Sequence, residues 1–342
     1  MQPFQFSRTG NLLSAYSAYR AADEGADAAH SRSQYLAGGT TLIDLMKLGV
    51  MRPGRVVDIN DLDQTDAGRI EFAGNRLRLG ALTRMSTVAD HPDVRRDFPV
   101  IAESLQLAAS AQIRNMASLG GNVLQRTRCS YFRDTSYSNC NKREPGSGCA
   151  ALEGINRGHA VLGISERCIA TYPGDFAQAL IALDAQVEVM GRNGPRELPF
   201  ANLHRQPGQT PHLETTLGPG ELITAFRITR APFTRRSLFL KVRDRQSYEF
   251  ALASAAVAID LDRDTVKQAR IALGGVATVP WRAHEAEASL RNQRLDETAT
   301  RRAADLAFAD ARPRKHNAFK IELGKRTLIR ALRQAGAMEI RP

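Results

Sequence analysis

The chain is organised around residues 117–168, which open with Ala117-Ser118-Leu119-Gly120-Gly121-Asn122, a glycine turn between apolar residues. The same stretch holds all four cysteines of the 342-residue chain: Cys129, Cys140, Cys149 and Cys168. A single cysteine is usually a small buried apolar residue. Here, however, cationic side chains crowd the same segment, and such neighbours lower the pKa of a thiol and favour the thiolate that binds metal. These side chains are Arg126, Arg128, Arg133, Lys142 and Arg143.

Turn-forming residues between Asn139 and Gly148 leave this segment without strand or helix periodicity. We therefore expect a long irregular loop that needs an internal tie. Two disulfides, a structural zinc ion or an iron-sulfur cluster could supply that tie. The cysteines are separated by ten, eight and eighteen residues, whereas zinc sites usually use paired C-x₂₋₄-C knuckles. The spacing argues against zinc and leaves the disulfides and the cluster open.

Four runs in this stretch carry a resemblance: GNVLQRTRC at 121–129, CNKR at 140–143, PGSGCAALEG at 145–154 and SERCIAT at 165–171. They resemble the FAD-binding (medium) subunit of bacterial periplasmic aldehyde oxidoreductases, in the xanthine dehydrogenase family of molybdenum hydroxylases. In that subunit, and in the related subunit of 4-hydroxybenzoyl-CoA reductase, the four cysteines of such an insertion hold a 4Fe-4S cluster. The resemblance therefore implies that Cys129, Cys140, Cys149 and Cys168 are metal ligands.

A second glycine turn lies near the N-terminus. A predicted strand at 34–37 leads into Gly38-Gly39-Thr40-Thr41, and apolar residues at helical spacing follow at 42–48. This order presents backbone N–H groups to a phosphate, although a strand-to-helix turn without a ligand has the same pattern. Neither the G-x-G-x-x-G fingerprint nor a P-loop is present. By resemblance, residues 36–47 are the pyrophosphate-binding loop for FAD, with contacts from Ala37, Gly38, Gly39, Thr40, Thr41, Leu42 and Ile43.

The turn at 118–122 resembles the second flavin loop of the family. The implied FAD contacts are Ser118, Gly121 and Asn122. The hydroxyl of Ser118 and the amide of Asn122 are expected near the ribityl and pyrophosphate groups.

Four more FAD contacts are implied by the resemblance. Asp175 precedes a predicted helix at 176–183, where its local interpretation is an N-cap; the resemblance adds a contact to the ribose and adenine side of FAD. Lys241 is implied to lie near the flavin, with Tyr248 and Phe250 near the ring edge. Surface charge and core packing are the alternative interpretations of these last three residues.

The order of predicted elements indicates an α+β fold. By resemblance, residues 1–228 form a PCMH-type FAD-binding domain of two subdomains, at about 1–57 and 58–228, with the cluster insertion at about 123–168. Residues 229–342 show strands followed by helices in blocks, which predicts a C-terminal domain of antiparallel sheet plus helices. Within the first domain we also expect a helix at 12–29 and strands at 159–163 and 168–171.

The composition excludes several classes of protein. The formal net charge of +11 attracts polyanions, but the arginines are spread along the chain and no nucleic-acid motif accompanies them. We therefore expect no nucleic acid partner. No apolar run is long enough for a membrane span, and the N-terminus shows no export signal. The resemblance implies a periplasmic location reached by co-export with a signal-bearing partner; the cytoplasm is the alternative.

By resemblance the chain is an electron-transfer flavoprotein subunit with no catalytic residues of its own. A molybdopterin-binding large subunit oxidises the substrate, a small subunit with 2Fe-2S clusters relays electrons, and the FAD subunit passes them to an external acceptor. A self-contained flavin oxidase and a disulfide-tied extracellular binding module are the alternatives. The oxidase lacks a residue that stands out as a substrate base or covalent flavin anchor. A disulfide-tied binding module would give neither glycine loop a role in binding a ligand.

Overall fold

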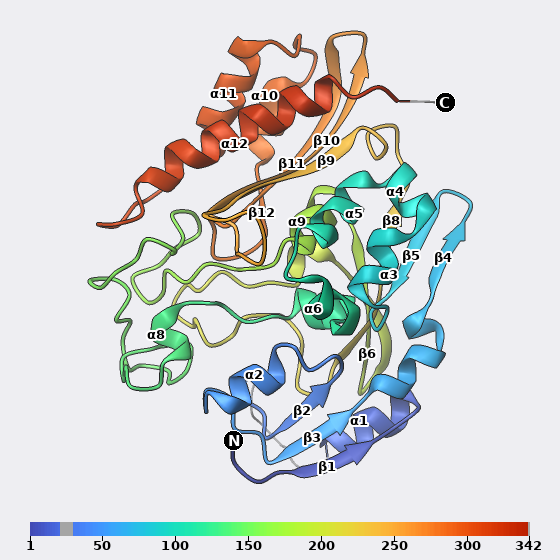
Figure 1. Ribbon diagram of the computed structural model, residues 1–342, viewed down its shortest axis with the longest axis vertical. Coiled ribbons are helices and arrows are strands. Elements are labelled where there is room, and N and C mark those ends of the chain that lie inside the picture. Colours follow the sequence, from blue (N-terminus) through green and yellow to red (C-terminus); the bar gives the residue numbers. More distant parts are fainter. Residues whose placement is uncertain (21–29, 341–342) are drawn as a thin grey trace.

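The computed structural model describes residues 1–20 and 30–340. Its strands form three sheets that follow one another along the molecule (Figure 1). The N-terminal sheet, in blue, lies at one end, and the C-terminal sheet with its helices, in orange and red, lies at the other. The fold is α+β, as the sequence predicted.

The N-terminal unit is a three-stranded parallel sheet in the order β1-β3-β2. Parallel neighbours need crossover connections, and α1 and α2 supply them. The buried side chains of Ala15, Val57 and Ile59 form its core. The elements are β1 (Gln5–Arg8), α1 (Leu12–Arg20), β2 (Ser33–Leu36), α2 (Leu42–Lys47) and β3 (Arg55–Asp58), followed by the 3₁₀ turns η1 (Asn60–Gln64) and η2 (Asp66–Gly68). The helix predicted at 12–29 is confirmed for Leu12–Arg20, and its remainder lies outside the described residues.

The central unit is a five-stranded antiparallel sheet in the order β4-β5-β8-β6-β7. Its strands are β4 (Ile70–Ala73), β5 (Arg76–Gly80), β6 (Gln186–Gly191), β7 (Gly194–Pro199) and β8 (Leu222–Thr229). Short helices pack against one face: α3 (Met85–Asp90), α4 (Pro92–Asp97), α5 (Pro99–Gln106), α6 (Ala111–Met116), α7 (Leu119–Val123) and α9 (Phe176–Ala182). A further 3₁₀ turn, η3 (Phe200–Asn202), follows β7.

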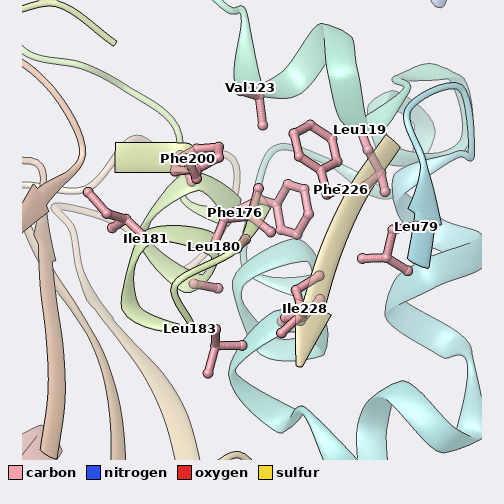
Figure 2. Close-up of a cluster of buried hydrophobic side chains, with 14 of the residues drawn as sticks. Leu79, Leu119, Val123, Phe176, Leu180, Ile181, Leu183, Phe200, Phe226 and Ile228 are labelled. Atoms are coloured by element: carbon pink, nitrogen blue, oxygen red, sulfur yellow. The ribbon is translucent and has the colours of Figure 1, made fainter. Parts of the chain in front are cut away.

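Phe226 of β8 lies at the centre of the core between this sheet and α9 (Figure 2). Its ring meets Phe176 edge to face at 5.8 Å and Phe200 at 6.3 Å. Every residue of α9 is buried, because α9 also contacts strands of the C-terminal sheet on its other side. A helix that is mostly apolar is expected in such a position, and Gln178 is the one polar residue of α9.

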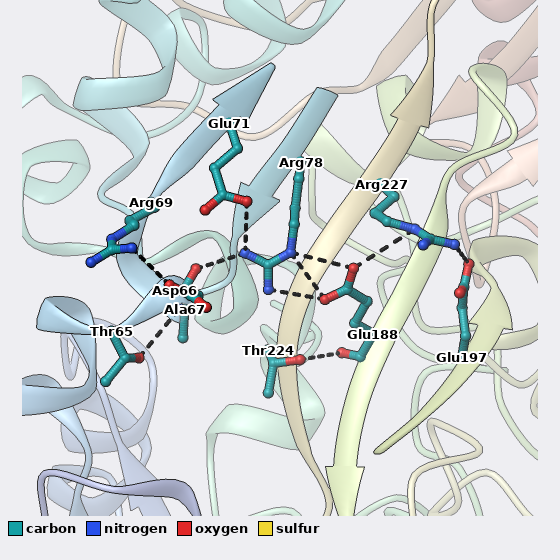
Figure 3. Close-up of polar contacts among 10 residues, drawn as sticks. All are labelled: Thr65, Asp66, Ala67, Arg69, Glu71, Arg78, Glu188, Glu197, Thr224 and Arg227. Atoms are coloured by element: carbon teal, nitrogen blue, oxygen red, sulfur yellow. Dashed lines mark hydrogen bonds and ion pairs between the residues drawn. The ribbon is translucent and has the colours of Figure 1, made fainter. Parts of the chain in front are cut away.

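The other face of the central sheet carries a row of ion pairs that crosses the strands (Figure 3). Arg78 of β5 pairs with Glu188 of β6 at 2.9 Å across β8. Arg227 of β8 contacts both Glu188, at 3.7 Å, and Glu197 of β7. This face is therefore polar, which matches the alternation of apolar and charged residues along β5.

The C-terminal unit is a four-stranded antiparallel sheet in the order β12-β11-β10-β9, with helices on one face. β10 is buried from Ala253 to Ile259 because α9 and α5 contact the opposite face. The elements are β9 (Ser237–Val242), β10 (Ala253–Asp262), β11 (Thr265–Gly274), β12 (Trp281–Arg282), α10 (His284–Leu290), α11 (Glu297–Ala307) and α12 (Phe319–Gly336). No helix in the described ranges is long and apolar enough to cross a membrane.

The long segment between α7 and α9 is irregular, as predicted, and contains one helical turn, α8 (Ser130–Arg133). The strands predicted at 159–163 and 168–171 are wrong. Only isolated bridges form there, Leu162 to Ala277 and Ser165 to Cys168. The backbone of Val161 and Leu162 instead donates to the carbonyl of Val276 after β11, so scattered tertiary hydrogen bonds replace a strand ladder.

Candidate functional site

A cavity of about 430 Å³ lies where the N-terminal unit meets the central unit. Three segments form most of its wall: the turn at 37–42, residues 118–126, and residues 213–223. Thr278 and Val279, which follow β11, also reach it. Pockets that bind small molecules and cofactors usually have volumes of a few hundred Å³ or more. Both glycine turns identified in the sequence line this cavity.

The first wall is the turn between β2 and α2. A Cβ atom at Gly38 would overlap the carbonyl oxygen of Met116, so only glycine allows the two turns to touch. Gly39 adopts φ +73°, a conformation that favours glycine. Within the described residues, the N–H groups of Thr40 and Thr41 donate to no acceptor of the chain. Both residues line the cavity and can therefore offer hydrogen bonds to a ligand.

The second wall is α7, a short helix that forms where the sequence predicted a glycine turn at 118–122. The hydroxyl of Ser118 accepts from the N–H of Gly121 at 3.2 Å and caps the helix. Gly120 donates to the carbonyl of Ala81, and a Cβ at Gly120 would lie 3.2 Å from the Cβ of Ala81. A Cβ at Gly121 would meet only the Ser118 hydroxyl, at 3.0 Å. A side chain at Gly121 would therefore require a small shift of the Ser118 hydroxyl, and beyond that hydroxyl its Cβ has no close neighbour.

The third wall, residues 213–223, was missed by the sequence analysis. Tyr35 of β2 donates its hydroxyl to the carbonyl of Gly220 at 2.9 Å, and burial raises the pKa of that hydroxyl. Gly220 has φ +77° and packs against the ring of Tyr16, to which a Cβ would approach within 3.0 Å. The Gly218-Pro219-Gly220 turn ahead of β8 was the available signal.

One end of the cavity is charged. Arg126 donates to Glu214 at 2.6 Å, and its guanidinium lies 4.6 Å from the centre of the Phe132 ring. Lys142 approaches the other oxygen of Glu214 at 3.7 Å. Burial tends to raise the pKa of Glu214, but Arg126 and then Lys142 hold it below its ordinary value. Two cations and one carboxylate therefore give this end of the cavity a net positive charge, which suits an anionic ligand.

The structure divides the implied FAD contacts into two sets. Those that line the cavity are Ala37, Gly38, Gly39, Thr40, Thr41, Leu42, Ser118 and Gly121. Those that do not line it are Ile43, Asn122, Asp175, Lys241, Tyr248 and Phe250. Asn122 is adjacent to the wall, and its side-chain oxygen is buried without a partner in the described part of the chain. Contact with FAD stays a prediction for all of these residues.

Asp175 and Lys241 form an ion pair at 2.6 Å, with side chains only 5% and 1% exposed. Lys241 also donates to the carbonyl of Leu107 at 3.1 Å. The pair joins the start of α9 to β9 and thus links the central unit to the C-terminal sheet. Asp175 occupies the N-cap position of α9, as its sequence context predicted, but its carboxylate makes no capping hydrogen bond and pairs with Lys241 instead.

Tyr248 and Phe250 lie on the loop between β9 and β10 and are 56% and 43% exposed. The guanidinium of Arg128 lies 5.1 Å from the centre of the Phe250 ring, and that of Arg245 lies 5.7 Å from Tyr248. These aromatic rings therefore pack on arginine side chains at the surface and do not belong to the core.

The four cysteines are free thiols that approach one another within the loop. Cys140 and Cys149 face each other across an antiparallel bridge. Cys129 shares apolar contacts with both regions. A hydrogen bond with the Cys168 thiol lowers the pKa of Cys149 to about 6 and raises the pKa of Cys168. Burial raises the pKa of Cys129, so the neighbouring cations do not lower the pKa of every thiol. Within residues 1–20 and 30–340, however, no group of three or more His, Cys, Asp or Glu side chains is arranged as a metal site.

His159 adds a contact that the sequence analysis did not anticipate. Its Nε2 atom lies 3.1 Å from the sulfur of Cys129, and the ring is buried. Backbone and side-chain hydrogen bonds fix its position: its N–H donates to Asn156, and its carbonyl accepts from Asn317 of the C-terminal domain. No sequence spacing pointed to the contact with Cys129, because Cys129 and Asn317 come from segments distant from His159.

Two family models match the chain. One is described as the FAD binding domain in molybdopterin dehydrogenase and matches residues 2–230. The other is described as the CO dehydrogenase flavoprotein C-terminal domain and matches residues 239–335.

Relatives and solved structures agree with these models. The chain is 47% identical to the aldehyde oxidoreductase FAD-binding subunit PaoB of Escherichia coli, over 89% of this chain and 92% of that protein. It is 24% identical to the glyceraldehyde dehydrogenase medium chain of Sulfolobus acidocaldarius, over 81% and 80%. A chain of the reconstituted CO dehydrogenase from Oligotropha carboxidovorans superposes with a TM-score of 0.76 at 24% identity, with coverage of 99% and 100%. That structural likeness shows the fold alone.

Proposed function

Since the chain belongs to the family of FAD-binding subunits of molybdopterin dehydrogenases, we propose that it is the flavoprotein subunit of a molybdenum-dependent aldehyde oxidoreductase. As an oxidoreductase subunit, it would accept electrons from a 2Fe-2S subunit and pass them through FAD to an external acceptor. The observation that carries this proposal is the cavity formed by the two glycine turns, which fall inside the matched residues 2–230.

The residues of the cavity fit FAD. A dinucleotide carries an anionic pyrophosphate, and backbone N–H groups in glycine turns are the usual donors to such a group. The N–H groups of Thr40 and Thr41 are available, and the cavity has a cationic end at Arg126 and Lys142. FAD supplies the redox chemistry when bound, whereas the chain supplies binding, orientation and local charge.

The same proposal assigns a 4Fe-4S cluster to Cys129, Cys140, Cys149 and Cys168. Four free thiols converge in a loop that has almost no regular structure of its own. Four cysteinates satisfy such a cluster, with no ligand left over. Binding of the cluster would draw the thiols into a closer arrangement than the chain alone adopts, since metal binding is coupled to local folding.

The proposed partners are a molybdopterin-binding large subunit and a 2Fe-2S small subunit. Relatives such as the glyceraldehyde dehydrogenase and CO dehydrogenase medium chains bear names that mark them as subunits. We place the assembled complex in the periplasm, exported with a signal-bearing partner. Cell fractionation that recovers the complex only in the cytoplasm would contradict this location.

The FAD assignment is tested by adding a side chain where packing leaves space. Gly121→Val places its branch beside the cavity without a strained backbone, so FAD affinity should fall by at least tenfold while the fold is kept. Gly39→Val is a poorer test, because its positive φ would be strained with or without FAD. Gly10→Val is the control, since a Cβ there has no neighbour nearer than 3.9 Å. Unchanged FAD affinity in Gly121→Val would remove α7 from the site.

The cluster assignment is tested by replacing each cysteine with serine. Each variant should lose iron and the broad visible absorption of the cluster, while FAD remains detectable by its own bands. Two disulfides in iron-free protein that is active in the complex would contradict the cluster.

The subunit assignment is tested on the purified chain with full FAD and iron. It should show no oxidation of aldehydes with an artificial electron acceptor until the partner subunits are added. Turnover at the rate of the complex would instead establish a self-contained flavin oxidase.

A further inference from the structure

Asp44 connects the turn of the FAD cavity to the cysteine loop. It lies in α2, three residues after Thr41, and its carboxylate contacts two arginines of the loop. Arg133 makes a bidentate pair, with its two terminal nitrogens 2.8 and 3.1 Å from the two oxygens. Arg128 donates to the same carboxylate at 3.2 Å. Arg128 precedes Cys129 directly, and Arg133 ends the helical turn that follows it.

The two arginines need this carboxylate. Arg128 and Arg133 are two cations that converge on one carboxylate, so loss of that carboxylate would leave two like charges close together without a counter-ion. The hydrogen bond from Arg133 in turn holds the pKa of Asp44 below its ordinary value. Bidentate arginine–carboxylate pairs fix geometry as well as charge. The arginine side chains are only 24% and 25% exposed, so solvent screens these contacts less than those of a fully exposed pair.

An apolar contact runs beside the ion pairs. Leu45, the next residue of α2, is fully buried and packs against Phe132 and Cys140 of the loop. Both the polar and the apolar sides of α2 are thus attached to the cysteine segment. The turn at 38–41 precedes α2 and cannot move independently of it, because Gly39 and Thr41 accept hydrogen bonds from Ile43 and Leu45.

From this arrangement we infer that Asp44 couples the two cofactor sites: a cysteine loop ordered by its metal holds α2, and with it the FAD turn, in the binding conformation. The inference rests on the proposed cluster and FAD sites. It makes Asp44 a positioning residue that touches neither cofactor. Coupling between sites is reciprocal in binding free energy, so cluster-loaded protein should bind FAD more tightly, and FAD-bound protein should retain more iron at equilibrium with a chelator.

The experiment measures FAD affinity of the full-length chain in two forms, cluster-loaded and cluster-free after chelation, by flavin fluorescence. Wild-type protein should bind FAD at least about fivefold more tightly when loaded, the lower end of common coupling strengths. In Asp44→Asn this ratio should fall below about twofold although every cysteine is retained. Arg133→Gln should lower the ratio in the same direction but by less, because Arg128 still pairs with Asp44. Adding Arg133→Gln to Asp44→Asn should change the ratio no further, because Asp44→Asn already removes the Arg133 contact.

Asp61→Asn is the matched control. Asp61 also pairs with an arginine in the N-terminal unit, Arg8 at 2.7 Å, but that arginine is not part of the cysteine loop. This control should keep the wild-type ratio. Equal FAD affinity of loaded and cluster-free wild-type protein would overturn the coupling while leaving both sites in place. Protein that binds FAD but takes up no iron would refute the cluster assignment and the coupling with it. Arg133→Gln decides the matter if Asp44→Asn fails to fold.

Discussion

The Asp175–Lys241 ion pair should stabilise the contact between the two domains. A double-mutant cycle measures the interaction energy of the pair. Both side chains are almost fully buried, and removing one member of a buried pair costs about 3–5 kcal/mol. Asp175→Asn and Lys241→Met should each destabilise the protein by that amount. In Lys241→Met the Leu107 carbonyl keeps a hydrogen-bond donor, because Arg243 also donates to it at 3.2 Å.

The double variant should lose much less free energy of unfolding than the sum of the losses in the two single variants. It leaves no unpaired charge, only a buried amide that costs about 1–3 kcal/mol. The two single losses add to roughly 6–10 kcal/mol, so the cycle should show a coupling of about 3 kcal/mol or more.

Urea unfolding of the C-terminal sheet is the assay, followed by the fluorescence of Trp281, the single tryptophan. Trp281 lies on β12 and pairs with Leu273 of β11 in the sheet that holds Lys241. With a slope near 3 kcal/mol per M, each single variant should shift the midpoint by roughly 1–2 M. FAD affinity of the double variant should stay within about threefold of wild type. If the losses of unfolding free energy were additive, the two side chains would not stabilise the protein as a pair. A large loss of FAD affinity in all three variants would instead support direct contact with the cofactor.

Three further predictions concern stability. Asp97 is buried and contacts Arg96, Arg230 and Arg235. The Arg96 hydrogen bonds lower the pKa of its carboxyl group in the folded state. The ionised carboxylate therefore stabilises the fold above about pH 4, and this contribution is lost as the pH falls through the lowered pKa. Asp97→Asn should cost about 1–2 kcal/mol at pH 7 and remove this loss on acid titration, and an unchanged acid midpoint would contradict the assignment. Phe226→Ala should cost about 3–5 kcal/mol by urea unfolding, because it opens a cavity at the centre of the core; a loss below about 1 kcal/mol would show that the site collapses. Glu188→Gln should cost less than about 1 kcal/mol, a difference that 1 M salt should reduce, since the row of ion pairs is partly exposed.

Much of the fold could be predicted because the pattern of each element is local. The strands of the C-terminal sheet and its last helix follow from their apolar runs, and the turn after β2 follows from Gly38-Gly39 between a strand and a helix. The same turn lines the cavity, so one wall of the site was visible in the sequence.

The rest depended on contacts between distant segments. Residues 213–223 line the cavity because Tyr35 binds Gly220, and nothing near either residue indicates the other. Asp175 has the sequence context of an N-cap, but burial against Lys241 decides its role. The segments at 159–163 and 168–171 have the composition of strands, yet they lie in a loop whose hydrogen bonds go to several partners, which overrides local propensity.

The position of β8 in the middle of the central sheet affects how the protein is made. Leu79 of β5 pairs with Phe226 of β8, and β6 pairs with β8 on its other edge. During synthesis the cysteine loop leaves the ribosome before β8 exists, and pairings between distant segments form late. The thiols are therefore exposed on an incomplete chain before the fold can enclose them. A long delay between translation of Cys168 and of β8 would lengthen the period in which they are open to oxidation or to delivery of iron.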